Sequence, residues 1–276
     1  MSTQDRAVEA HHDDWDRHWD DYAAAAERNP AQRYRRRVAL DLLEAEGAPL
    51  RLLDVGSGLG DFLAVAARRW PSAALLGLEP SAVGVRRAQA KVPAARFVCG
   101  DLTAGADVPG DLERWATHAV CSEVLEHVDD DVALLAAATR LMAPGCRLVV
   151  TVPGGRMSAF DRHIGHRRHY TPRSLAATLR AAGYAVETTT GAGFPFFNLY
   201  RRLVIARGAA LVDDVRTGAG EPTGLARVAM AGFGPLFRLN APSSPWGVQI
   251  VGVARVAGAA APSSPRTPAR SASAPT

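Results

Sequence analysis

The run LLDVGSGLGDF contains the residues best suited to hold a ligand through the polypeptide backbone. Gly56, Gly58 and Gly60 follow an apolar stretch and precede a helix-forming one, and glycine permits the left-handed turns and close approach that a nucleotide-like ligand requires. The spacing is G-x-G-x-G, whereas dinucleotide-binding proteins carry G-x-G-x-x-G. Asp54 before the loop and Asp61 after it would repel a pyrophosphate, so the loop favours a cationic ligand.

The segment GGRMSAFDRHIGHRRHYTPRSL offers a second kind of chemistry, because it combines three histidines and five arginines with one acid. His163 or His166 could act as the base that removes a proton from an acceptor, and the arginines could bind a carboxylate or phosphate. The alternative is a solvated basic loop in which Asp161 and Tyr170 fix the turn. No metal site is predicted, since the arginines around the histidines disfavour a cation.

Short apolar runs alternate with amphipathic stretches from about residue 33 to 192, a pattern typical of a parallel sheet covered by helices. Strands are predicted at 50–55, 73–78, 96–99, 118–122, 147–152, 184–190 and 246–256. Helices are predicted at 34–46, 61–70, 81–91, 129–142 and 172–183. We expect a turn at 143–145 and irregular structure from 156 to 170.

Three further segments frame this unit. Residues 1–32 are predicted to form a helical lid that carries Trp15, Trp19 and Tyr22 on one face; a helix packed at the sheet edge is the alternative. Residues 193–245 are predicted to form a helical insertion before the last strand, with helices at 196–211 and 225–239. Residues 257–276 lack the apolar side chains needed to fold, and we expect a disordered tail.

From about residue 33 to 192 the chain resembles the class I S-adenosylmethionine-dependent methyltransferases. The resemblance rests on the glycine loop, the acids in LGLEPS and CGDL, and the run SEVLEHVD, in the order and spacing of that family. SEVLEHVD is similar to a motif of small-molecule methyltransferases, including those of quinone biosynthesis. The implied fold is α/β: a Rossmann-like, doubly wound sheet of seven strands in the order 3-2-1-4-5-7-6, the last strand antiparallel, in a domain spanning 33–256.

The resemblance also implies a cofactor, S-adenosyl-L-methionine, and the residues that hold it. In that family the glycine loop lies beneath the methionine part, Glu79 would bind both ribose hydroxyls, and Asp101 would lie near the adenine amino group. The predicted cofactor-binding residues are Asp54, Gly56, Ser57, Gly58, Gly60, Glu79, Pro80, Asp101, Leu102, Glu123 and Val124.

Methyl transfer from a sulfonium requires an aligned nucleophile and a site that excludes water. We expect a small or medium organic acceptor, methylated at a carboxylate oxygen, a hydroxyl oxygen or an amine nitrogen, in that order of preference. The predicted acceptor-binding residues are Trp19, Tyr22, Arg162, His169, Tyr170, Phe194 and Phe197. The aromatic run 194–200 is predicted to roof the pocket; core packing is one alternative, and contact with a membrane surface is another, because Arg201 and Arg202 follow.

Composition and charge argue against several other classes of protein. The net charge is +4, no stretch is long and apolar enough to cross a bilayer, and the first residues show no secretory pattern. Three widely spaced cysteines suit a reducing cytoplasm, which is the expected location. Nothing resembles a nucleic-acid-binding module. The sequence does not indicate an oligomeric state.

Two other function classes stay open on the sequence alone. An NAD-linked oxidoreductase would use Glu79 equally well, but the glycine spacing is wrong, and Lys91, the only lysine, is poorly placed for a catalytic Tyr/Lys pair. A non-catalytic cofactor-binding or assembly protein would keep the glycine loop without an acceptor pocket.

Overall fold

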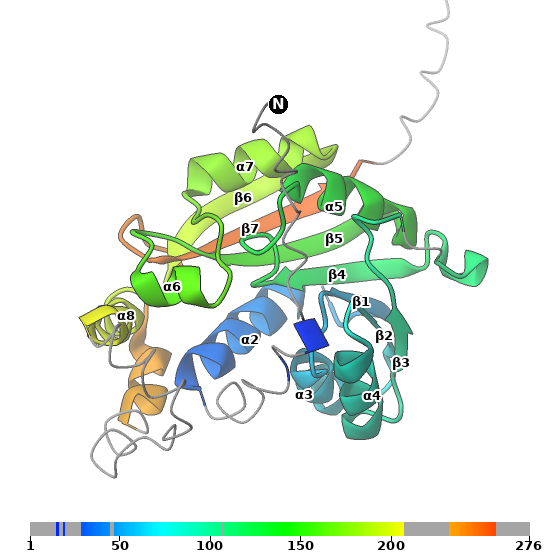
Figure 1. The fold of residues 1–276 in the computed structure, drawn as a ribbon, viewed down its shortest axis with the longest axis horizontal. Coiled ribbons are helices and arrows are strands. Elements are labelled where there is room, and N and C mark those ends of the chain that lie inside the picture. The colour runs from blue at the N-terminus through cyan, green and yellow to red at the C-terminus, as the bar shows by residue number, and fades with distance from the viewer. Residues whose placement is uncertain are drawn as a thin grey trace, which may run out of the picture.

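The computed structural model describes residues 15, 16, 19, 29–44, 47–105, 108–206 and 232–257. At its centre is a seven-stranded sheet in the order β3-β2-β1-β4-β5-β7-β6 (Figure 1). The strands are β1 (Arg51–Val55), β2 (Ala74–Glu79), β3 (Arg96–Cys99), β4 (Ala116–Ser122), β5 (Met142–Pro153), β6 (Tyr184–Ala192) and β7 (Gln249–Val256). Strands β1 to β5 run parallel, and β7 is antiparallel to β5 and β6. The predicted fold class and strand order are confirmed.

The helices cover both faces of the sheet (Figure 1). They are α2 (Pro30–Leu43), α3 (Asp61–Arg69), α4 (Ala82–Lys91), α5 (Asp131–Ala138), α6 (Ala159–His163), α7 (Pro172–Ala181) and α8 (Phe196–Ala206). Helices α2, α3 and α4 lie on one face, and α5 and α7 on the other. Helices α6 and α8 lie beyond one end of the sheet, beside α2.

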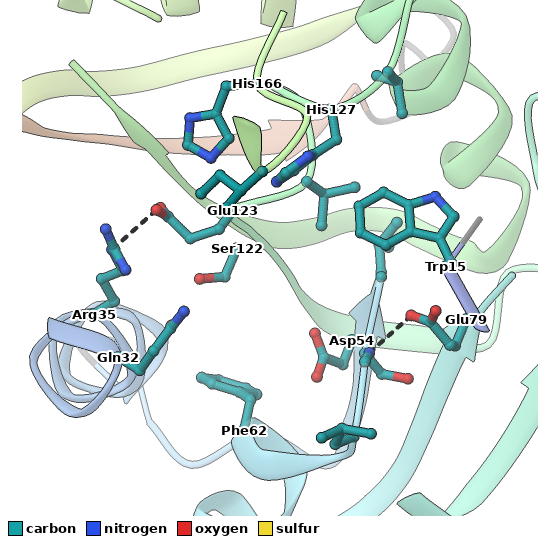
Figure 2. Close-up of a pocket in the computed structure, with 18 of the residues that line it drawn as sticks. Trp15, Gln32, Arg35, Asp54, Phe62, Glu79, Ser122, Glu123, His127 and His166 are labelled. Atoms are coloured by element: carbon teal, nitrogen blue, oxygen red, sulfur yellow. Dashed lines mark hydrogen bonds and ion pairs between the residues drawn. The ribbon is translucent and has the colours of Figure 1, made fainter. Parts of the chain in front are cut away.

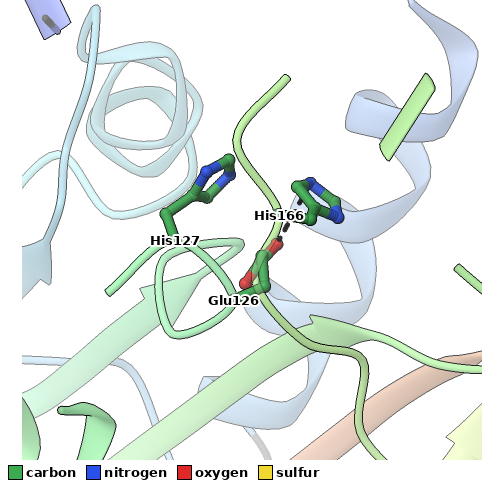
Figure 3. Close-up of side chains that lie close together, drawn as sticks. All are labelled: Glu126, His127 and His166. Carbon is green, nitrogen blue, oxygen red and sulfur yellow. Dashed lines mark ion pairs between the residues drawn. The ribbon is translucent and has the colours of Figure 1, made fainter. Parts of the chain in front are cut away.

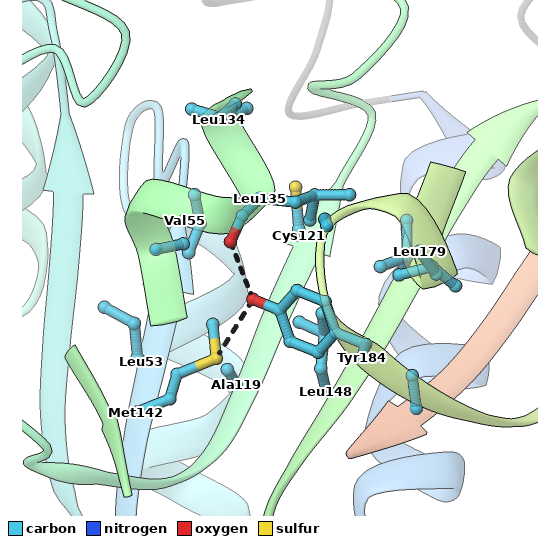
Figure 4. Close-up of a cluster of buried hydrophobic side chains, with 14 of the residues drawn as sticks. Leu53, Val55, Ala119, Cys121, Leu134, Leu135, Met142, Leu148, Leu179 and Tyr184 are labelled. Atoms are coloured by element: carbon cyan, nitrogen blue, oxygen red, sulfur yellow. Dashed lines mark hydrogen bonds between the residues drawn. The ribbon is translucent and has the colours of Figure 1, made fainter. Parts of the chain in front are cut away.

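Successive side chains of the central strands enter two separate apolar clusters. In β5, Val149 packs with the residues of α2 and α3, whereas Leu148 and Val150 pack with those of α5 and α7. In the second cluster the buried Tyr184 hydroxyl donates to the carbonyl of Leu135 at 2.9 Å (Figure 4). Coverage on both faces explains why the sequence of this strand is apolar without alternation.

Two helices differ from the sequence prediction near the pocket described below. Helix α2 begins at Pro30 rather than at residue 34, because Asn29 caps it by accepting a hydrogen bond from the Ala31 amide at 2.9 Å, and proline is compatible with a first helical turn. Within the stretch predicted as irregular, α6 forms where Ser158 and Asp161 make a reciprocal capping box.

Other boundaries also require correction. Helix α5 ends at Ala138, and a 3₁₀ turn over 139–141 leads directly into β5. Residues 143–145, predicted as a turn, belong to β5, whose pairing with β4 shifts register there. Strand β7 begins at Gln249, and Trp246, predicted to be in it, lies outside.

The predicted flanking segments are described only in part. Of the insertion, α8 and a helical stretch at 232–239 are described, while residues 207–231 lie outside the described part of the chain. The same holds for most of the predicted lid and for the predicted tail from residue 258. No helix in the described residues is long and apolar enough to cross a membrane.

Candidate active site

A pocket of about 560 Å³ opens where β1, β2 and β4 end (Figure 2). One end, which we call the cofactor end, is lined by the glycine loop and the acids that follow the strands. The other, the acceptor end, is lined by side chains from α2, α6, α8 and the segment after α6. This position agrees with the rule that open α/β sheets bind ligands at the carboxyl ends of their strands.

Backbone hydrogen bonds hold the glycine loop against the end of β2. The amides of Gly56 and Ser57 both donate to the carbonyl of Leu78, at 2.8 and 2.9 Å. Gly56 has a φ of +72°, and a β-carbon there would lie 2.4 Å from a methyl of Val124. A side chain at this position would be strained and would collide with the β4 end, so the loop requires glycine here.

Glu79 lies at the end of β2 and is nearly inaccessible to solvent. Its carboxylate accepts hydrogen bonds from the Gly58 amide at 2.8 Å, the Ser81 amide at 3.2 Å and the Trp19 indole at 3.2 Å. Burial raises its pKa, although these hydrogen bonds oppose the shift. The Trp19 ring lies 2.8 Å from where a β-carbon of Gly58 would be, so this part of the predicted lid covers the glycine loop.

Asp54 gives the cofactor end its electrostatic character. Burial raises the pKa of its carboxyl group to about 8, and the charges of Glu79 and Asp61 add to the shift. Such crowded carboxyl groups are stabilised by a positively charged ligand. Nearby, the buried hydroxyl of Ser57 has no hydrogen-bond partner among the described residues. These features suit a sulfonium compound carrying polar groups.

The remaining predicted cofactor residues line the same pocket. They are Pro80, Asp101, Leu102, Glu123 and Val124. The Asp101 carboxylate accepts from the Thr103 amide at 2.8 Å and from its hydroxyl at 2.6 Å, which fixes its orientation. The structure thus brings the predicted cofactor-binding residues to one cavity, except Gly60, which does not line it.

Glu123 lies at the junction of the two ends. It has an unusual backbone conformation, and its carboxylate contacts three side chains. Its φ is +59°, which is rare for a residue with a side chain. Its carboxylate lies 2.9 Å from the Arg35 guanidinium and accepts hydrogen bonds from Gln249 at 2.8 Å and Thr151 at 3.1 Å. Helix α2 and strand β7 thereby hold this carboxylate toward the acceptor end (Figure 2).

After β5, the side chains of Asp161, His169 and His166 lie next to one another. Asp161 is buried and accepts hydrogen bonds from the Ser158 amide at 2.7 Å and from Arg201 of α8 at 2.8 Å. Burial alone would raise the pKa of Asp161, but these partners outweigh it and hold the pKa below its usual value. Asp161 therefore stays ionised, and its Oδ2 lies 3.8 Å from Nε2 of His169.

The hydrogen bonds of the histidines define their tautomers. His169 Nδ1 lies 3.2 Å from the carbonyl of Gly155, which can only accept, so this nitrogen carries the proton. The other nitrogen of His169 then accepts from Nδ1 of His166 at 3.2 Å. His166 is left with an unprotonated Nε2. Burial lowers the pKa of His166 to about 3, with a further contribution from His127, so the ring is neutral at physiological pH.

Glu126 lies behind these rings and is fully buried, with no hydrogen-bond partner for either carboxylate oxygen among the described residues. Burial, reinforced by Glu123, raises its pKa well above the usual value. Its Oε1 lies 4.0 Å from Nε2 of His166 (Figure 3). Together with His127 these two residues bring possible metal ligands within 4.8 Å of one another, and the group contains none of the arginines on which the prediction of no metal rested.

A model for a methyltransferase domain matches residues 22–189. The chain belongs to this methyltransferase family. It is 31% identical to a trans-aconitate 2-methyltransferase of Methylobacterium nodulans, over 66% of this chain and 67% of that one. It is 29% identical to a ubiquinone biosynthesis O-methyltransferase of Xylella fastidiosa, over 51% of this chain and 63% of that one. The match therefore spans about two thirds of the length of these relatives.

A solved structure with the same fold is phosphoethanolamine N-methyltransferase 2 of Haemonchus contortus in complex with S-adenosyl-L-methionine. Its TM-score is 0.57 at 14% identity, over 89% of this chain and 60% of that one. Family membership makes this chain an S-adenosylmethionine-dependent methyltransferase, as the sequence predicted, and sets aside the hypothesis of an NAD-linked oxidoreductase. The glycine loop, the unpartnered Ser57 hydroxyl and the carboxylates of Asp54 and Glu79 are the groups of the methyltransferase that fit this cofactor.

Not all predicted catalytic and acceptor-binding residues of the methyltransferase lie at the pocket. His163 and Arg162 are exposed at the end of α6, and Arg162 donates instead to the carbonyl of Met157. The short helix ends there, and Gly165, with a φ of +89°, turns the chain so that His166 rather than His163 faces the cavity.

Of the aromatic residues predicted to bind the acceptor, only some lie at the pocket. Phe197 lines the pocket. Tyr170 is buried away from it, where its hydroxyl donates to Asp131 at 2.6 Å and supports the fold. Phe194 is partly exposed and its ring packs against Trp246 at a tilt. Tyr22 lies outside the described residues.

Four residues at or behind the acceptor end of the methyltransferase were not singled out from the sequence. Arg35 and Arg201, the partner of Asp161, line the pocket, whereas Glu126 and Gln249 lie behind it. Glu126 stands inside the SEVLEHVD run, so the motif that indicated Glu123 could have indicated it as well. Nothing in the local sequence distinguishes Arg35 or Gln249, because they contact Glu123 and each other across long stretches of sequence, 214 positions in the case of Arg35 and Gln249.

Proposed function

We propose that this methyltransferase transfers a methyl group to a hydroxyl oxygen of a small or medium-sized, largely apolar organic acceptor. The observation that carries the proposal is that a single pocket joins the cofactor end to the unprotonated Nε2 of His166. S-adenosylmethionine supplies an already activated methyl group. The protein's own task is to align the acceptor oxygen, exclude water and receive a proton.

In this proposal His166 is the general base. As the oxygen–carbon bond forms and the carbon–sulfur bond breaks, the hydroxyl proton moves to Nε2 of His166. Burial lowers the pKa of His166, and the ionised Asp161 opposes that shift. The ion pair of Asp161 with Arg201 joins α6 to α8. His169 contributes by holding His166 in the tautomer with Nε2 available.

Charge balance at the acceptor end favours a hydroxyl over a carboxylate, which was the first preference from sequence. Each arginine that lines the pocket in the described residues has an acidic partner. The pairs are Arg35–Glu123, Arg36–Asp61, Arg167–Asp129 and Arg201–Asp161. A carboxylate acceptor would have to compete with these acids, whereas an uncharged acceptor would not. The nearby Phe160, Ile164 and Phe197 suit an apolar body.

The two curated relatives make the choice testable, since the name of one specifies O-methylation in ubiquinone biosynthesis and that of the other specifies trans-aconitate. Purified protein is incubated with methyl-labelled cofactor and matched acceptors: substituted phenols, trans-aconitate and primary amines. Methylated products are identified by mass spectrometry. We expect transfer to phenolic oxygen. Transfer to trans-aconitate or to amines with none to phenols would contradict the proposal.

Substitution of His166 tests the base. His166→Ala should lower kcat by about 10² to 10⁴ while cofactor affinity, measured by calorimetry, stays unchanged. His163→Ala, three residues earlier and exposed, is the matched control and should keep its activity. Full activity of the His166→Ala enzyme would show that His166 is not the general base. Loss of wild-type activity on chelation, restored by added metal, would instead make His166 a ligand.

A further inference from the structure

Exposed large apolar side chains are concentrated in one region of the described structure. Seven of the eight lie between residues 194 and 246, and the eighth is Leu50, which directly precedes β1. Scattered exposed apolar residues are normal in proteins, but a concentration of this kind marks a surface that is covered in use. We therefore expect a binding partner to cover this surface.

Helix α8 presents apolar side chains on two faces. Phe197 and Tyr200 are buried, and Phe197 packs on Tyr34 of α2 with ring centroids 5.0 Å apart. Leu199 and Leu203, in contrast, remain 48% and 49% exposed. In Figure 1 α8 lies at the edge of the molecule, outside α2. The inner face thus lines the acceptor end, and the outer face is left without a covering element in the described structure.

Beside the outer face lies a hollow of about 460 Å³. Phe194 and Trp246 pack against each other in its wall with ring centroids 5.4 Å apart, and Trp246 is 68% exposed. Arg156 and Arg202 also line it, and neither forms a hydrogen bond or ion pair within the described part of the chain. This differs from the acceptor end, where every lining arginine in the described part has an acid beside it.

The described residues of this region carry charge of a single sign. The described residues 194–206 and 232–247 contain three arginines and neither aspartate nor glutamate. A second copy of the chain, joined by the same surface, would place arginines opposite arginines. Exposed aromatic and aliphatic side chains flanked by unpaired arginines are instead the combination that binds anionic lipid at the depth of its head groups.

We propose that this surface, formed by the outer face of α8, Phe194, Trp246 and the two unpaired arginines, docks on an anionic lipid bilayer without entering it deeply. Phe197, Tyr200 and Val204 of the same helix line the acceptor end. Docking therefore brings the pocket next to the bilayer, where apolar molecules collect. The inference goes beyond the methyl transfer proposed above and does not depend on which atom is methylated.

Vesicle flotation tests the docking. The full chain is mixed with vesicles of phosphatidylcholine alone or with about 30% phosphatidylglycerol, which carries the surface charge that arginines recognise. We expect the protein to float with the anionic vesicles only, and binding to fall as salt rises. Leu203→Glu and Trp246→Glu should each lower the bound fraction at least about tenfold, since each puts an acid into the contact.

Leu50→Glu is the matched control, because Leu50 is 72% exposed but lies outside the surface. It should bind as the wild type does. Unchanged thermal unfolding and cofactor binding establish that each variant is folded. Three results would overturn the proposal: no flotation with anionic vesicles, equal loss in Leu50→Glu, or a dimer in sedimentation that Leu203→Glu dissociates while vesicles bind nothing. Methyl transfer to a water-soluble phenol, measured without vesicles, checks the proposed function separately.

Discussion

The two ends of the pocket are built in different ways. At the cofactor end the key contact is a backbone amide of Gly58 donating to Glu79, 21 positions along the chain on the neighbouring strand. At the acceptor end Arg35 donates to Gln249, 214 positions away. The first end is a consequence of how adjacent parallel strands terminate, whereas the second depends on side chains that meet only in the finished fold.

The ends also differ in charge. Burial raises the pKa of Asp54, and the nearby Glu79 and Asp61 add to the shift. Asp54 and Glu79 have no basic side chain as a partner among the described residues, so acids outnumber bases at the cofactor end. The arginines and acids of the acceptor end form pairs. A cation is therefore favoured at one end and a neutral molecule at the other.

The largest expected effect breaks the backbone architecture of the cofactor end. Gly56→Ala places a β-carbon 2.4 Å from Val124 and forces a side chain into a left-handed turn, so the loop must shift. Cofactor affinity in calorimetry should fall at least about 100-fold, or roughly 3 kcal/mol. Gly110→Ala, where a β-carbon meets nothing within 4 Å, should bind normally. Equal affinities in the two variants would show that the loop geometry is unimportant.

The next effect tests the side-chain pairing of the acceptor end. Arg35→Met leaves the largely buried Glu123 carboxylate without its guanidinium, 2.9 Å away. Urea unfolding should show a loss of about 3 kcal/mol in stability, as for other broken buried pairs. Arg37→Met is the control on the same helix, since its pair with Asp41 is about half exposed and should contribute less than about 0.5 kcal/mol. Similar losses in both would mean that burial of the pair has no special role.

The smallest effect concerns the charge of the cofactor end. Because the pKa of Asp54 is raised to about 8, the folded protein keeps this proton at pH values where the unfolded chain has released it. Stability from this group therefore falls as pH rises toward 8. Between pH 5 and pH 7 the wild type should lose about 2 kcal/mol relative to Asp54→Asn. Asp41→Asn, at an exposed site, should follow the wild type; parallel curves for Asp54→Asn would refute the raised pKa.

The sequence predicted the cofactor end well because its information is local. Gly56 and Gly58 follow directly on a strand, and Glu79 ends the next one, so short motifs place all three. The strand order came with the family resemblance and was confirmed. Boundaries were less accurate where a cap or a bulge decided them, as at Asn29 and in residues 143–145.

The acceptor end could be predicted only in outline. His163 and His166 look alike in the sequence, and the choice between them depends on where α6 stops and on the turn at Gly165. Glu123 was expected at the cofactor, but its partners Arg35 and Gln249 come from a helix and a strand that show no sign of function in their own sequences. Such contacts are properties of tertiary packing.

The position of β7 has a consequence for the nascent chain. Strand β6 pairs with β7 and with no other described strand, so it remains an open edge on the ribosome until residues 249–256 emerge. Gln249 emerges with that strand and adds the last hydrogen bond to Glu123, whose other partners, Arg35 and Thr151, come earlier in the chain. All the predicted cofactor-binding residues precede residue 125. The ribosome therefore synthesises them long before Gln249, which belongs to the acceptor side of the site.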